Sequence, residues 1–569
     1  MATGDENGDI MPTVEFYLED LQKLIDKKIS IKELEELILF VKGEFEAFEE
    51  GIVKVDIKDT NRPDLWSVEG IARELRTHLS GKFPEYKINK SKFVMVVDKK
   101  VEKVRAKTVC AVVKNLKFDD YFIKQIIQLQ EKIHSTYGGN RNFAAIGIYD
   151  FDKIKFPIKY TTVRPEGIRF TPLDFNEEMT PKEILERHPC GRDYGHLIKK
   201  YSEYPIMIDS AKNVLSIPPI INSDYTGKIT DKTKNVFIEI TGHEIERISV
   251  ALNVLVTALA ERGGRIYSME IKYPGKKIVR PDLKPEKFFL DPDYCRKTLG
   301  LDISNKEMIR LLNRAGYKAR LDKGVSLEYP AYRNDIMHSR DVIEDIAISY
   351  GYNNIKPDFP KISTLGGADS LEEFCDVVRE ICVGLGFQET MTFSLTNKDS
   401  IFNKMNVPEG NICKLLNPVS SNWTVLRNWL LPSMLYFLTN NMHIEYPQRI
   451  FEVGDCVILD SKEETKTRTV KKLSAVITDS TVSYEEISSS LDALMRNLGI
   501  GYRLRALKHG SFIEGRAAEI LADGVRIGII GEINPQVLNN WRLEKPAVGF
   551  EINVAIVYRI LYNLIAKSR

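Results

Sequence analysis

Apolar and polar positions repeat with two different periods along this chain, and the changes of period predict its elements. Between residues 11 and 91, a period of two predicts strands, and a spacing of three to four residues predicts amphipathic helices. The expected strands are Val14–Tyr17 and Gly51–Ile57, and the expected helices are Leu18–Ile25, Ile31–Ile38 and Ser67–His78. Ser30 is the expected N-cap of the second helix. Residues 11–91 are therefore predicted to form an N-terminal α/β domain.

The following residues, 92–273, mix both periods and predict a second α/β domain. Its expected strands are Phe93–Val97, Thr108–Val113, Phe143–Tyr149 and Val236–Thr241, and its expected helices are Tyr121–Tyr137 and Glu244–Arg262. Residues 274–287 are rich in proline and in basic side chains, which is typical of a linker.

Two more segments complete the chain. Residues 288–357 predict a compact, mostly helical domain, with helices at Ser304–Ala315 and Asp341–Tyr350 that end at Gly316 and Gly351. Residues 358–569 predict a large mixed unit, with helices at Ser370–Leu385 and Tyr484–Leu498 and a strand at Arg449–Leu459. The predicted fold class is α+β, arranged in several domains.

Composition excludes several classes of protein. A hydrophobic content of 43% in 569 residues supplies several packed cores, so disorder of the whole chain is excluded. The 81 basic and 80 acidic side chains nearly cancel, which excludes a histone-like polycation but not a local basic face. Residues 1–10 are acidic and polar, so we expect a disordered extension rather than a signal peptide.

The apolar stretches and the cysteines indicate a cytoplasmic protein with no membrane segment. Residues Ile248–Ala260 form the most apolar stretch, which is too short for the ~20 residues that a bilayer requires. The seven cysteines are scattered and contain no CxxC pair, which fits a reducing compartment. Cys375 and Cys382 fall on one face of a predicted helix and are interpreted as buried small apolar residues.

The common catalytic motifs are missing or incomplete. No GxxxxGK[ST] or GxSxG pattern occurs, and His243-Glu244 cannot open a HExxH site because position 247 is Arg. Residues His188–His196 concentrate two histidines, a cysteine and an arginine. Because no matching partner spacing exists elsewhere, we interpret them as an ordered loop before a helix from about Leu197.

Four carboxylates gather between residues 335 and 345. If Ser339 caps a helix, Asp341, Glu344 and Asp345 share one helix face, and Asp335 lies in the approach to it. Four such groups repel one another, and Mg²⁺ relieves that repulsion because it prefers oxygen ligands. Acidic residues also collect in first helical turns because the helix dipole favours them there. The spacing leaves both interpretations open.

Three blocks of sequence resemble the β subunit of phenylalanyl-tRNA synthetases of the archaeal/eukaryotic type. The blocks are Asn61–Glu74 (NRPDLWSVEGIARE), Tyr332–Ile355, and the segment from Asn417-Pro418 to Phe451–Asp455. They occur in the family's order, and the resemblance covers nearly all of residues 11–555.

The resemblance implies a metal site and a partner. In the family, carboxylates matching Asp335, Asp341, Glu344 and Asp345 bind Mg²⁺ near the contact with an α subunit. Position 345 is Asp where the pattern often has Glu, so its reach is shorter. Residues 288–357 resemble a winged-helix-like domain. The implied assembly is an (αβ)₂ heterotetramer that uses ATP and Mg²⁺ to attach phenylalanine to tRNA.

Residues 358–569 resemble the catalytic fold of class II synthetases, an antiparallel sheet flanked by helices. Arg427 stands in a motif-2-like position, but Asn428-Trp429 follow it instead of the expected acid. Val548–Val554 resemble the strand of motif 3, but the motif's arginine is missing after it. Arginines hold ATP phosphates in such sites, so we expect a non-catalytic copy that leaves aminoacylation to the α subunit.

Residues 92–273 resemble the family's editing domain, which hydrolyses tyrosine wrongly attached to the tRNA. The candidate pocket residues are Ser216, Asn222, Glu239 and Thr241. Alternation places Glu239 and Thr241 on one strand face, and a hydrogen-bond acceptor can select the tyrosine hydroxyl. The alternative is that Glu239 faces solvent on an edge strand and Ser216 merely ends a strand.

Two other functions compete with that of a ligase subunit. One is a stand-alone RNA-binding or assembly scaffold, and the other is a trans-editing hydrolase. A second chain of class II type that copurifies in equal amount favours the ligase, whereas hydrolysis of Tyr-tRNA by the chain alone favours the trans-editing hydrolase.

Overall fold

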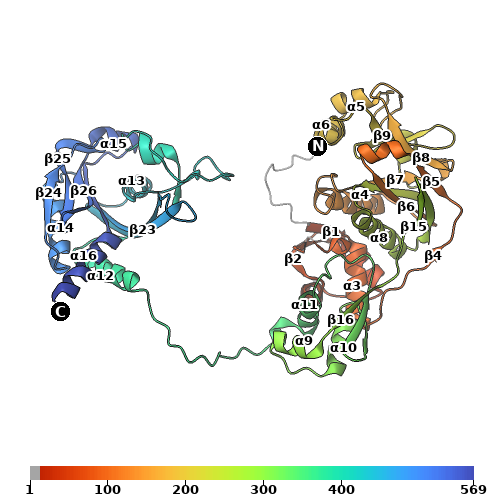
Figure 1. Ribbon diagram of the computed structural model, residues 1–569, viewed down its shortest axis with the longest axis horizontal. Helices are drawn as coiled ribbons and strands as arrows, with labels where there is room; N and C mark the ends of the chain where they lie inside the picture. The colour runs from red at the N-terminus through yellow and green to blue at the C-terminus, as the bar shows by residue number, and fades with distance from the viewer. Residues whose placement is uncertain (1–12, 60, 569) are drawn as a thin grey trace. The chain divides into compact units, whose positions relative to one another are not determined.

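The computed structural model describes residues 13–59 and 61–568, and the chain divides into two compact units (Figure 1). Unit 1 extends to Asp358, and unit 2 begins at Phe359. Both combine helices with sheets, so the predicted α+β class is confirmed. The extension predicted for residues 1–10 lies outside the described residues. No helix within the described ranges is long and apolar enough to cross a membrane.

The first segment of unit 1 is a three-stranded antiparallel sheet in the order β1-β3-β2, accompanied by three helices. Its elements are β1 (Thr13–Tyr17), α1 (Leu18–Ile25), α2 (Ile31–Ile38), β2 (Gly43–Glu49), β3 (Ile52–Ile57) and α3 (Val68–Ser80). The Ser30 hydroxyl accepts a hydrogen bond from the Glu33 N–H (3.2 Å), as the sequence predicts. Strand β2 was not expected, because a register shift between Phe45 and Ala47 interrupts its alternation.

Two sheets form the middle segment of unit 1. The five-stranded sheet has the order β4-β13-β6-β12-β7, and the seven-stranded sheet has the order β11-β10-β9-β8-β5-β14-β15. The strands of the first are β4 (Ile88–Asn89), β6 (Lys107–Lys114), β7 (Ala144–Asp150), β12 (Val236–Gly242) and β13 (Arg265–Tyr267). Those of the second are β5 (Val94–Val97), β8 (Ile158–Val163), β9 (Tyr204–Ile208), β10 (Val214–Ile217), β11 (Ile221–Asn222), β14 (Met269–Tyr273) and β15 (Lys276–Arg280).

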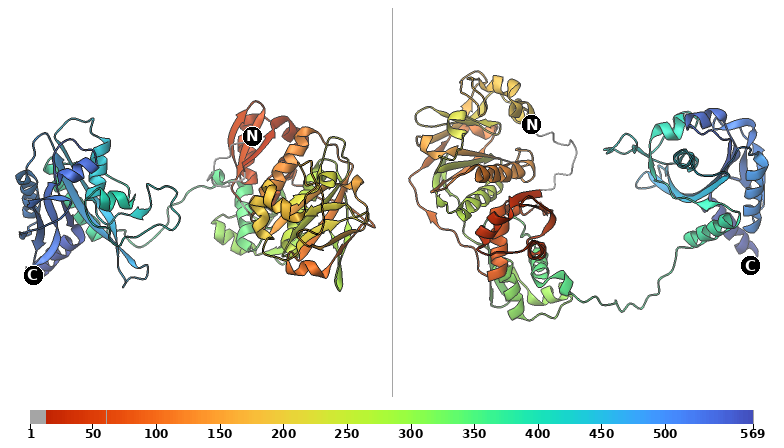
Figure 2. Two further views of the ribbon diagram at one scale, coloured as in Figure 1. Left: turned by 90° about the horizontal axis from the view of Figure 1, so that it is seen from above. Right: turned by 180° about the vertical axis from the view of Figure 1, so that it is seen from behind.

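Helices cover the five-stranded sheet, and its core is continuous with that of the first segment. Helix α8 (Ile245–Glu261) packs on β6 and β12, and helix α4 (Asp120–Ser135) packs on β7 (Figures 1 and 2). The most apolar stretch of the sequence is therefore a buried helix of this core. Strand β12 lies between β6 and β7, so it is not an edge strand.

Two local expectations for the middle segment differ from the structure. Strand β15 occupies part of the stretch expected as a linker, because Pro274-Gly275 makes the turn of a hairpin with β14 and Gly275 has a φ of +77°. The His188–His196 loop is instead helix α6 (Pro189–Tyr194), which follows α5 (Pro181–Arg187), and no helix starts at Leu197. The His188 ring caps α6 by accepting the Cys190 N–H at 3.2 Å, so this histidine is structural.

The last segment of unit 1 holds a three-stranded antiparallel sheet, order β16-β18-β17, as well as the expected helices. Its elements are β16 (Glu286–Leu290), α9 (Pro292–Leu299), α10 (Asn305–Arg314), β17 (Lys318–Leu321), β18 (Val325–Tyr329) and α11 (Ser339–Tyr350). Gly316, at φ +82°, follows the end of α10 as predicted. The cap of α11 is His338, one residue before the predicted Ser339.

Unit 2 is a seven-stranded sheet in the order β19-β22-β23-β27-β26-β25-β24, flanked by helices. Its strands are β19 (Gln388–Glu389), β22 (Gln448–Leu459), β23 (Thr467–Thr478), β24 (Tyr502–Ala506), β25 (Phe512–Ala522), β26 (Val525–Ile533) and β27 (Ala547–Asn553). All neighbouring pairs are antiparallel except β19–β22. The sheet is therefore antiparallel apart from the short pair β19–β22.

Two helical layers enclose this sheet. One core contains side chains of α12 (Ser370–Gly384), α14 (Tyr484–Asn497) and α16 (Val554–Ser568). A second core contains side chains of α13 (Leu431–Asn440) and α15 (Pro535–Asn540). Cys375 and Cys382 are buried in the first core, where they pack as small apolar residues, as predicted.

Candidate functional site

A cavity of about 460 Å³ in the middle segment of unit 1 is lined by residues of both sheets. Three of the four candidate pocket residues reach it, namely Ser216 on β10, Asn222 on β11 and Glu239 on β12. Apolar side chains of α4, β7 and the loop before β11 supply most of the remaining wall, among them Ile126, Ile146, Ile148, Pro218, Pro219 and Ile220. Such an apolar cavity with a few convergent polar groups is the usual form of a small-ligand site.

In the described part of the chain, Glu239 is a charged group of this cavity that lacks a full set of partners, as Arg141 also does at its Nε. It is 2% exposed, and its Oε1 accepts a hydrogen bond from the Tyr149 hydroxyl at 2.9 Å. Its Oε2 has no partner among the described residues. Burial raises the pKa of Glu239 to about 7, against the opposing effects of the Tyr149 hydrogen bond and Arg105. The alternative of a solvent-facing Glu239 on an edge strand is therefore wrong.

Ser216 is a further polar group of the cavity with an unpaired atom. It is 1% exposed, it pairs with Asn222 across the β10–β11 hairpin, and its Oγ makes no hydrogen bond within the described ranges. The Asn222 amide donates to the Ile148 carbonyl at 3.3 Å, which ties this hairpin to β7. Buried polar atoms are rarely left unpaired, so Glu239 Oε2, Ser216 Oγ and Arg141 Nε around one cavity indicate a polar ligand.

Thr241 does not line the cavity, although it shares a strand face with Glu239. Its Oγ1 accepts a hydrogen bond from Arg105 Nε at 2.8 Å, and the Thr241 carbonyl accepts another from Arg105 Nη2 at 2.6 Å. Arg105 also donates to the carbonyls of Arg141 and Asn142, so it fixes the loop after α4. The geometry gives Thr241 a supporting role in the strand beside the pocket.

Glu131, Arg141 and Cys190 are among the cavity residues that the sequence analysis missed. Arg141 donates to the Ile220 carbonyl at 2.9 Å and stands over the Tyr194 ring at 4.2 Å. The available signal was the Gly138-Gly139 pair before Arg141, which marks a turn with unusual backbone angles; Arg141 itself has a φ of +64°. Burial raises the pKa of the Cys190 thiol, which makes it a weak nucleophile.

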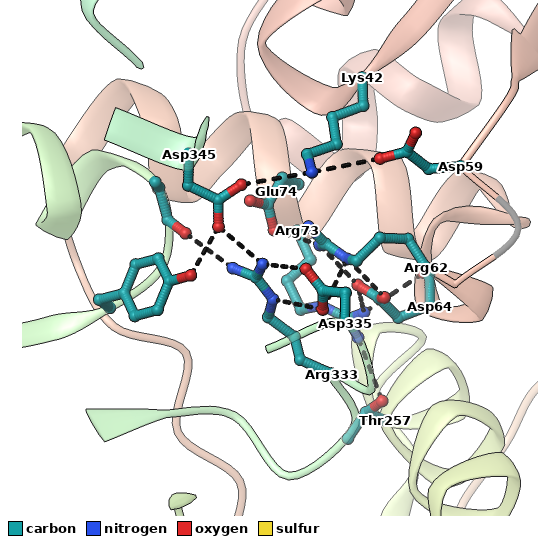
Figure 3. A network of polar contacts seen from close by, with 12 residues as sticks. Lys42, Asp59, Arg62, Asp64, Arg73, Glu74, Thr257, Arg333, Asp335 and Asp345 are labelled. Atoms are coloured by element: carbon teal, nitrogen blue, oxygen red, sulfur yellow. Dashed lines mark hydrogen bonds and ion pairs between the residues drawn. The ribbon is translucent and has the colours of Figure 1, made fainter. Parts of the chain in front are cut away.

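A network of buried ion pairs joins the two signature blocks that begin at Asn61 and Tyr332 (Figure 3). The Arg62 guanidinium binds both carboxylate oxygens of Asp64 at 2.9 Å. Arg333 contacts both oxygens of Asp335 and binds Asp345 Oδ2 at 2.7 Å. Each block thus carries the same Arg-x-Asp pair, and Arg62 Nε lies 3.8 Å from Asp335 Oδ1.

The network extends to each of the three segments of unit 1. Lys42 Nζ lies 3.5 Å from Asp345 Oδ1 and 2.9 Å from Glu344 Oε2. Arg73 on α3 donates to the Thr257 hydroxyl on α8 at 3.1 Å and lies 3.8 Å over the Tyr332 ring. The network therefore contacts the first segment, the middle segment and the last segment.

The four predicted metal ligands do not fit a Mg²⁺ site as the chain arranges them. Arg333 and Arg62 hold the pKa of Asp335 well below its ordinary value despite burial, and Arg333 and Lys42 lower the pKa of Asp345, also against burial. Asp341 Oδ2 accepts the N–H groups of Met337 and His338, at 2.8 and 2.6 Å. No group of three or more His, Cys, Asp or Glu side chains in the described part of the chain is arranged to hold a metal.

We expect Asp341→Ala to destabilise unit 1 by ~0.5–2 kcal/mol, because the variant loses the capping box of α11. The loss should be the same in Mg²⁺ and in EDTA, measured by chemical denaturation. Glu344→Ala is the control: among the described residues this half-exposed side chain pairs with Lys42 alone, so its loss should stay below ~1 kcal/mol. A destabilisation that appears only in the presence of Mg²⁺ would instead favour the metal interpretation.

In unit 2, each of the three guanidinium nitrogens of Arg427 donates a hydrogen bond within the protein. This arginine is 3% exposed and binds Glu452 Oε1 at 2.7 Å, the Thr392 hydroxyl at 2.7 Å and the Asp455 carbonyl at 2.8 Å. Glu551 on β27 accepts the N–H groups of Leu430 and Leu431 at the start of α13. Because the guanidinium of Arg427 is buried and its nitrogens already donate to Glu452, Thr392 and Asp455, it is not available to bind a phosphate.

Three family models match the chain: the B3/4 domain at residues 91–268, the tRNA synthetase B5 domain at 288–352, and the phenylalanyl tRNA synthetase beta chain CLM domain at 355–554. The phenylalanine–tRNA ligase beta subunit of Pyrococcus furiosus is 48% identical over 557 residues, which cover 96% of this chain and 100% of that protein. The beta subunit of Methanocaldococcus jannaschii is 40% identical over 552 residues, with 96% and 100% covered.

A solved structure of part of a relative also resembles this chain. An N-terminal fragment of the phenylalanyl-tRNA synthetase beta subunit of Pyrococcus horikoshii is 48% identical, covers 60% of this chain and 100% of the fragment, and has a TM-score of 0.58. Identity at this level over nearly the whole length, together with the three matched domains, shows the relationship that the signature blocks predict. The chain belongs to the family of phenylalanine–tRNA ligase beta subunits.

Proposed function

We propose that this chain works in the cytoplasm as the beta subunit of a phenylalanine–tRNA ligase and that its middle segment hydrolyses tyrosine wrongly attached to the tRNA. The observation that supports the editing activity is the cavity in which Glu239 Oε2 and Ser216 Oγ both lack partners. A partner alpha subunit, in an (αβ)₂ heterotetramer, would bind ATP and Mg²⁺ and attach phenylalanine. The tRNA would be shared between the two sites.

The cavity can distinguish tyrosine from phenylalanine through one hydroxyl group. A tyrosyl side chain in the cavity would donate its hydroxyl to Glu239 Oε2, whereas phenylalanine has no donor to offer. An unpaired buried acceptor costs ~1–3 kcal/mol, so phenylalanine would bind less well. Because the rest of the wall is largely apolar, both rings fit equally well and the hydroxyl decides.

The hydrolysis that we propose uses water as the nucleophile. Water attacks the carbonyl carbon of the aminoacyl ester, the bond to the ribose oxygen breaks, and the tRNA hydroxyl leaves with a proton from water. The Ser216 hydroxyl would orient the ester or the water, since its Oγ has no other partner in the described part of the protein. No covalent intermediate is required.

Unit 2 supports a non-catalytic role for this chain in aminoacylation. The buried contacts of Arg427 leave it unable to hold a phosphate, and β27 is followed by Val554–Ser568 with its first arginine at position 559. The sheet of unit 2 would serve as an assembly platform for the alpha subunit.

We expect that the purified chain alone shows no phenylalanine-dependent pyrophosphate exchange, and that coexpression with a candidate alpha subunit restores both exchange and tRNA charging. Hydrolysis of preformed Tyr-tRNA should be measured for the chain alone and for the complex. Robust exchange by the chain alone would contradict the proposal. Hydrolysis by the chain without any association with an alpha subunit would favour a trans-editing hydrolase, and neither association nor hydrolysis would favour an RNA-binding scaffold.

A further inference from the structure

We propose that Tyr149 is a positioning residue of the pocket: its hydroxyl holds one carboxylate oxygen of Glu239 so that the other is presented to the hydroxyl of a bound tyrosyl group. This inference rests on the proposed editing function and names the residue that makes Glu239 selective. Tyr149 does not line the cavity and lies fully buried at 0% exposure.

The contact between the two side chains is set by strand pairing. Strand β12 pairs antiparallel with β7, so that Glu239 lies opposite Gly147 and Phe237 lies opposite Tyr149. Tyr149 is then a diagonal neighbour of Glu239 on the same face, within reach of a long side chain. Its hydroxyl donates to Glu239 Oε1 at 2.9 Å.

Gly147 makes this contact sterically feasible. A Cβ atom at position 147 would stand 2.7 Å from Glu239 Oε1 and even closer to the Tyr149 hydroxyl. Any side chain there would separate the two groups or displace them. The glycine thus leaves the space in which the carboxylate and the phenol meet.

Tyr149 is the one side chain in the described ranges that donates a hydrogen bond to Glu239. The other titratable groups near this carboxylate are Arg105, Cys110 and Tyr160. Arg105 directs its donors to Thr241 and to backbone carbonyls. Burial and the Glu239 charge raise the pKa of Tyr149 well above its ordinary value, so its hydroxyl stays protonated and remains a donor.

The contact leaves Glu239 with one occupied and one open oxygen. A carboxylate without a fixed donor can rotate and exchange its two oxygens between the protein and the cavity. With Oε1 held by Tyr149, Oε2 is the acceptor that remains for a ligand. A pre-oriented acceptor loses less freedom when it binds the hydroxyl, which raises the selectivity for tyrosine.

The test is Tyr149→Phe in the complex with the alpha subunit, with Tyr160→Phe as the matched control. Tyr160 is also a fully buried tyrosine of this segment, but its hydroxyl donates to the Arg105 carbonyl at 2.8 Å and not to Glu239. We expect Tyr149→Phe to slow hydrolysis of Tyr-tRNA about tenfold, as for a hydrogen bond to a charged group, while charging with phenylalanine stays unchanged. Tyr160→Phe should leave hydrolysis within about twofold.

A double-mutant cycle separates positioning from a merely structural role. In a Glu239→Ala background, Tyr149→Phe should have no further effect on hydrolysis, because the group it orients is absent. An equal slowing by Tyr149→Phe with and without Glu239 would show that the phenol acts through packing, for example against Phe237, and would overturn the proposal.

A second readout does not depend on hydrolysis. The titration of Glu239 can be followed by infrared difference spectra between the parent and Glu239→Gln. Tyr149→Phe removes a donor to the Glu239 anion, so the midpoint of the titration should move to higher pH. Tyr160→Phe removes no such donor, so the midpoint should not change. An unmoved midpoint would overturn the proposal. A moved midpoint in a complex that fails to hydrolyse Tyr-tRNA would refute the proposed function while showing that the contact exists.

Discussion

Replacing Arg333 with methionine is expected to destabilise unit 1 by ~3–5 kcal/mol, the largest effect of any single substitution considered for this chain. Arg333 is the direct partner of both Asp335 and Asp345, and all three side chains are at most 5% exposed. Methionine preserves much of the volume, so packing changes little. The loss comes from two buried carboxylates that no longer have a guanidinium between them.

The measurement is urea denaturation of the full chain, with hydrogen exchange of unit 1 peptides to assign the transition. Arg310→Met is the matched control, because Arg310 is a more exposed arginine whose ion pair is with Glu307 on the same helix, worth less than ~1 kcal/mol. Combining Arg333→Met with Asp335→Asn and Asp345→Asn should recover part of the loss, because the uncompensated charges are removed as well. A loss for Arg333→Met no larger than for Arg310→Met would show that the network is dispensable.

The second large effect concerns selectivity. Glu239→Ala is expected to slow hydrolysis of Tyr-tRNA by the complex by about 5–150-fold, since it removes an acceptor worth ~1–3 kcal/mol. Charging with phenylalanine should stay unchanged, because Glu239 lies in unit 1 and aminoacylation is assigned to the partner. The two rates are measured on the same preparation. Parent-like hydrolysis would move the search for the acceptor to Ser216 and Asn222, and an equal fall of both rates would make Glu239 structural.

Comparing the parent with Glu239→Gln tests how the rate of Tyr-tRNA hydrolysis depends on pH. With its pKa raised to about 7 by burial, the Glu239 carboxylate is charged above that pH and protonated below it. The ratio of parent to Glu239→Gln hydrolysis rates should therefore fall as the pH drops through about 7. A ratio is used because the hydrolysis of the ester by hydroxide changes both rates equally with pH. The ratio is measured between pH 5 and 9, about two units on each side of the Glu239 pKa of about 7. A ratio that stays constant over this window would contradict the role of the Glu239 anion as the acceptor.

The raised pKa of Glu239 also predicts how the stability of the folded chain depends on pH. A carboxyl group with a raised pKa binds its proton more tightly in the folded state, so its contribution to stability is present at low pH. That contribution is lost as the pH rises from the ordinary value of 4.5 to about 7. Across this window the parent should lose stability relative to Glu239→Gln, whose amide does not titrate.

The sequence by itself determined the elements whose signals are local. Helices α1 and α2 have the predicted bounds because their apolar spacing and the Ser30 cap act within a few residues. The family could also be inferred from the sequence, because the blocks that begin at Asn61 and Tyr332 are continuous runs of residues. Glu239 was found as a candidate because it lies on a strand with a clear pattern.

Only the tertiary structure decided which polar groups meet. The pattern around Asp341 predicted a metal site or a solvated helix start, whereas Asp345 in fact pairs with Arg333 and Lys42, which come from different segments. Likewise, strand alternation placed Thr241 beside Glu239, but Arg105 occupies its hydroxyl. Charge pairing acts through space between residues far apart in the chain, and burial decides its strength, so neither can be read from local spacing.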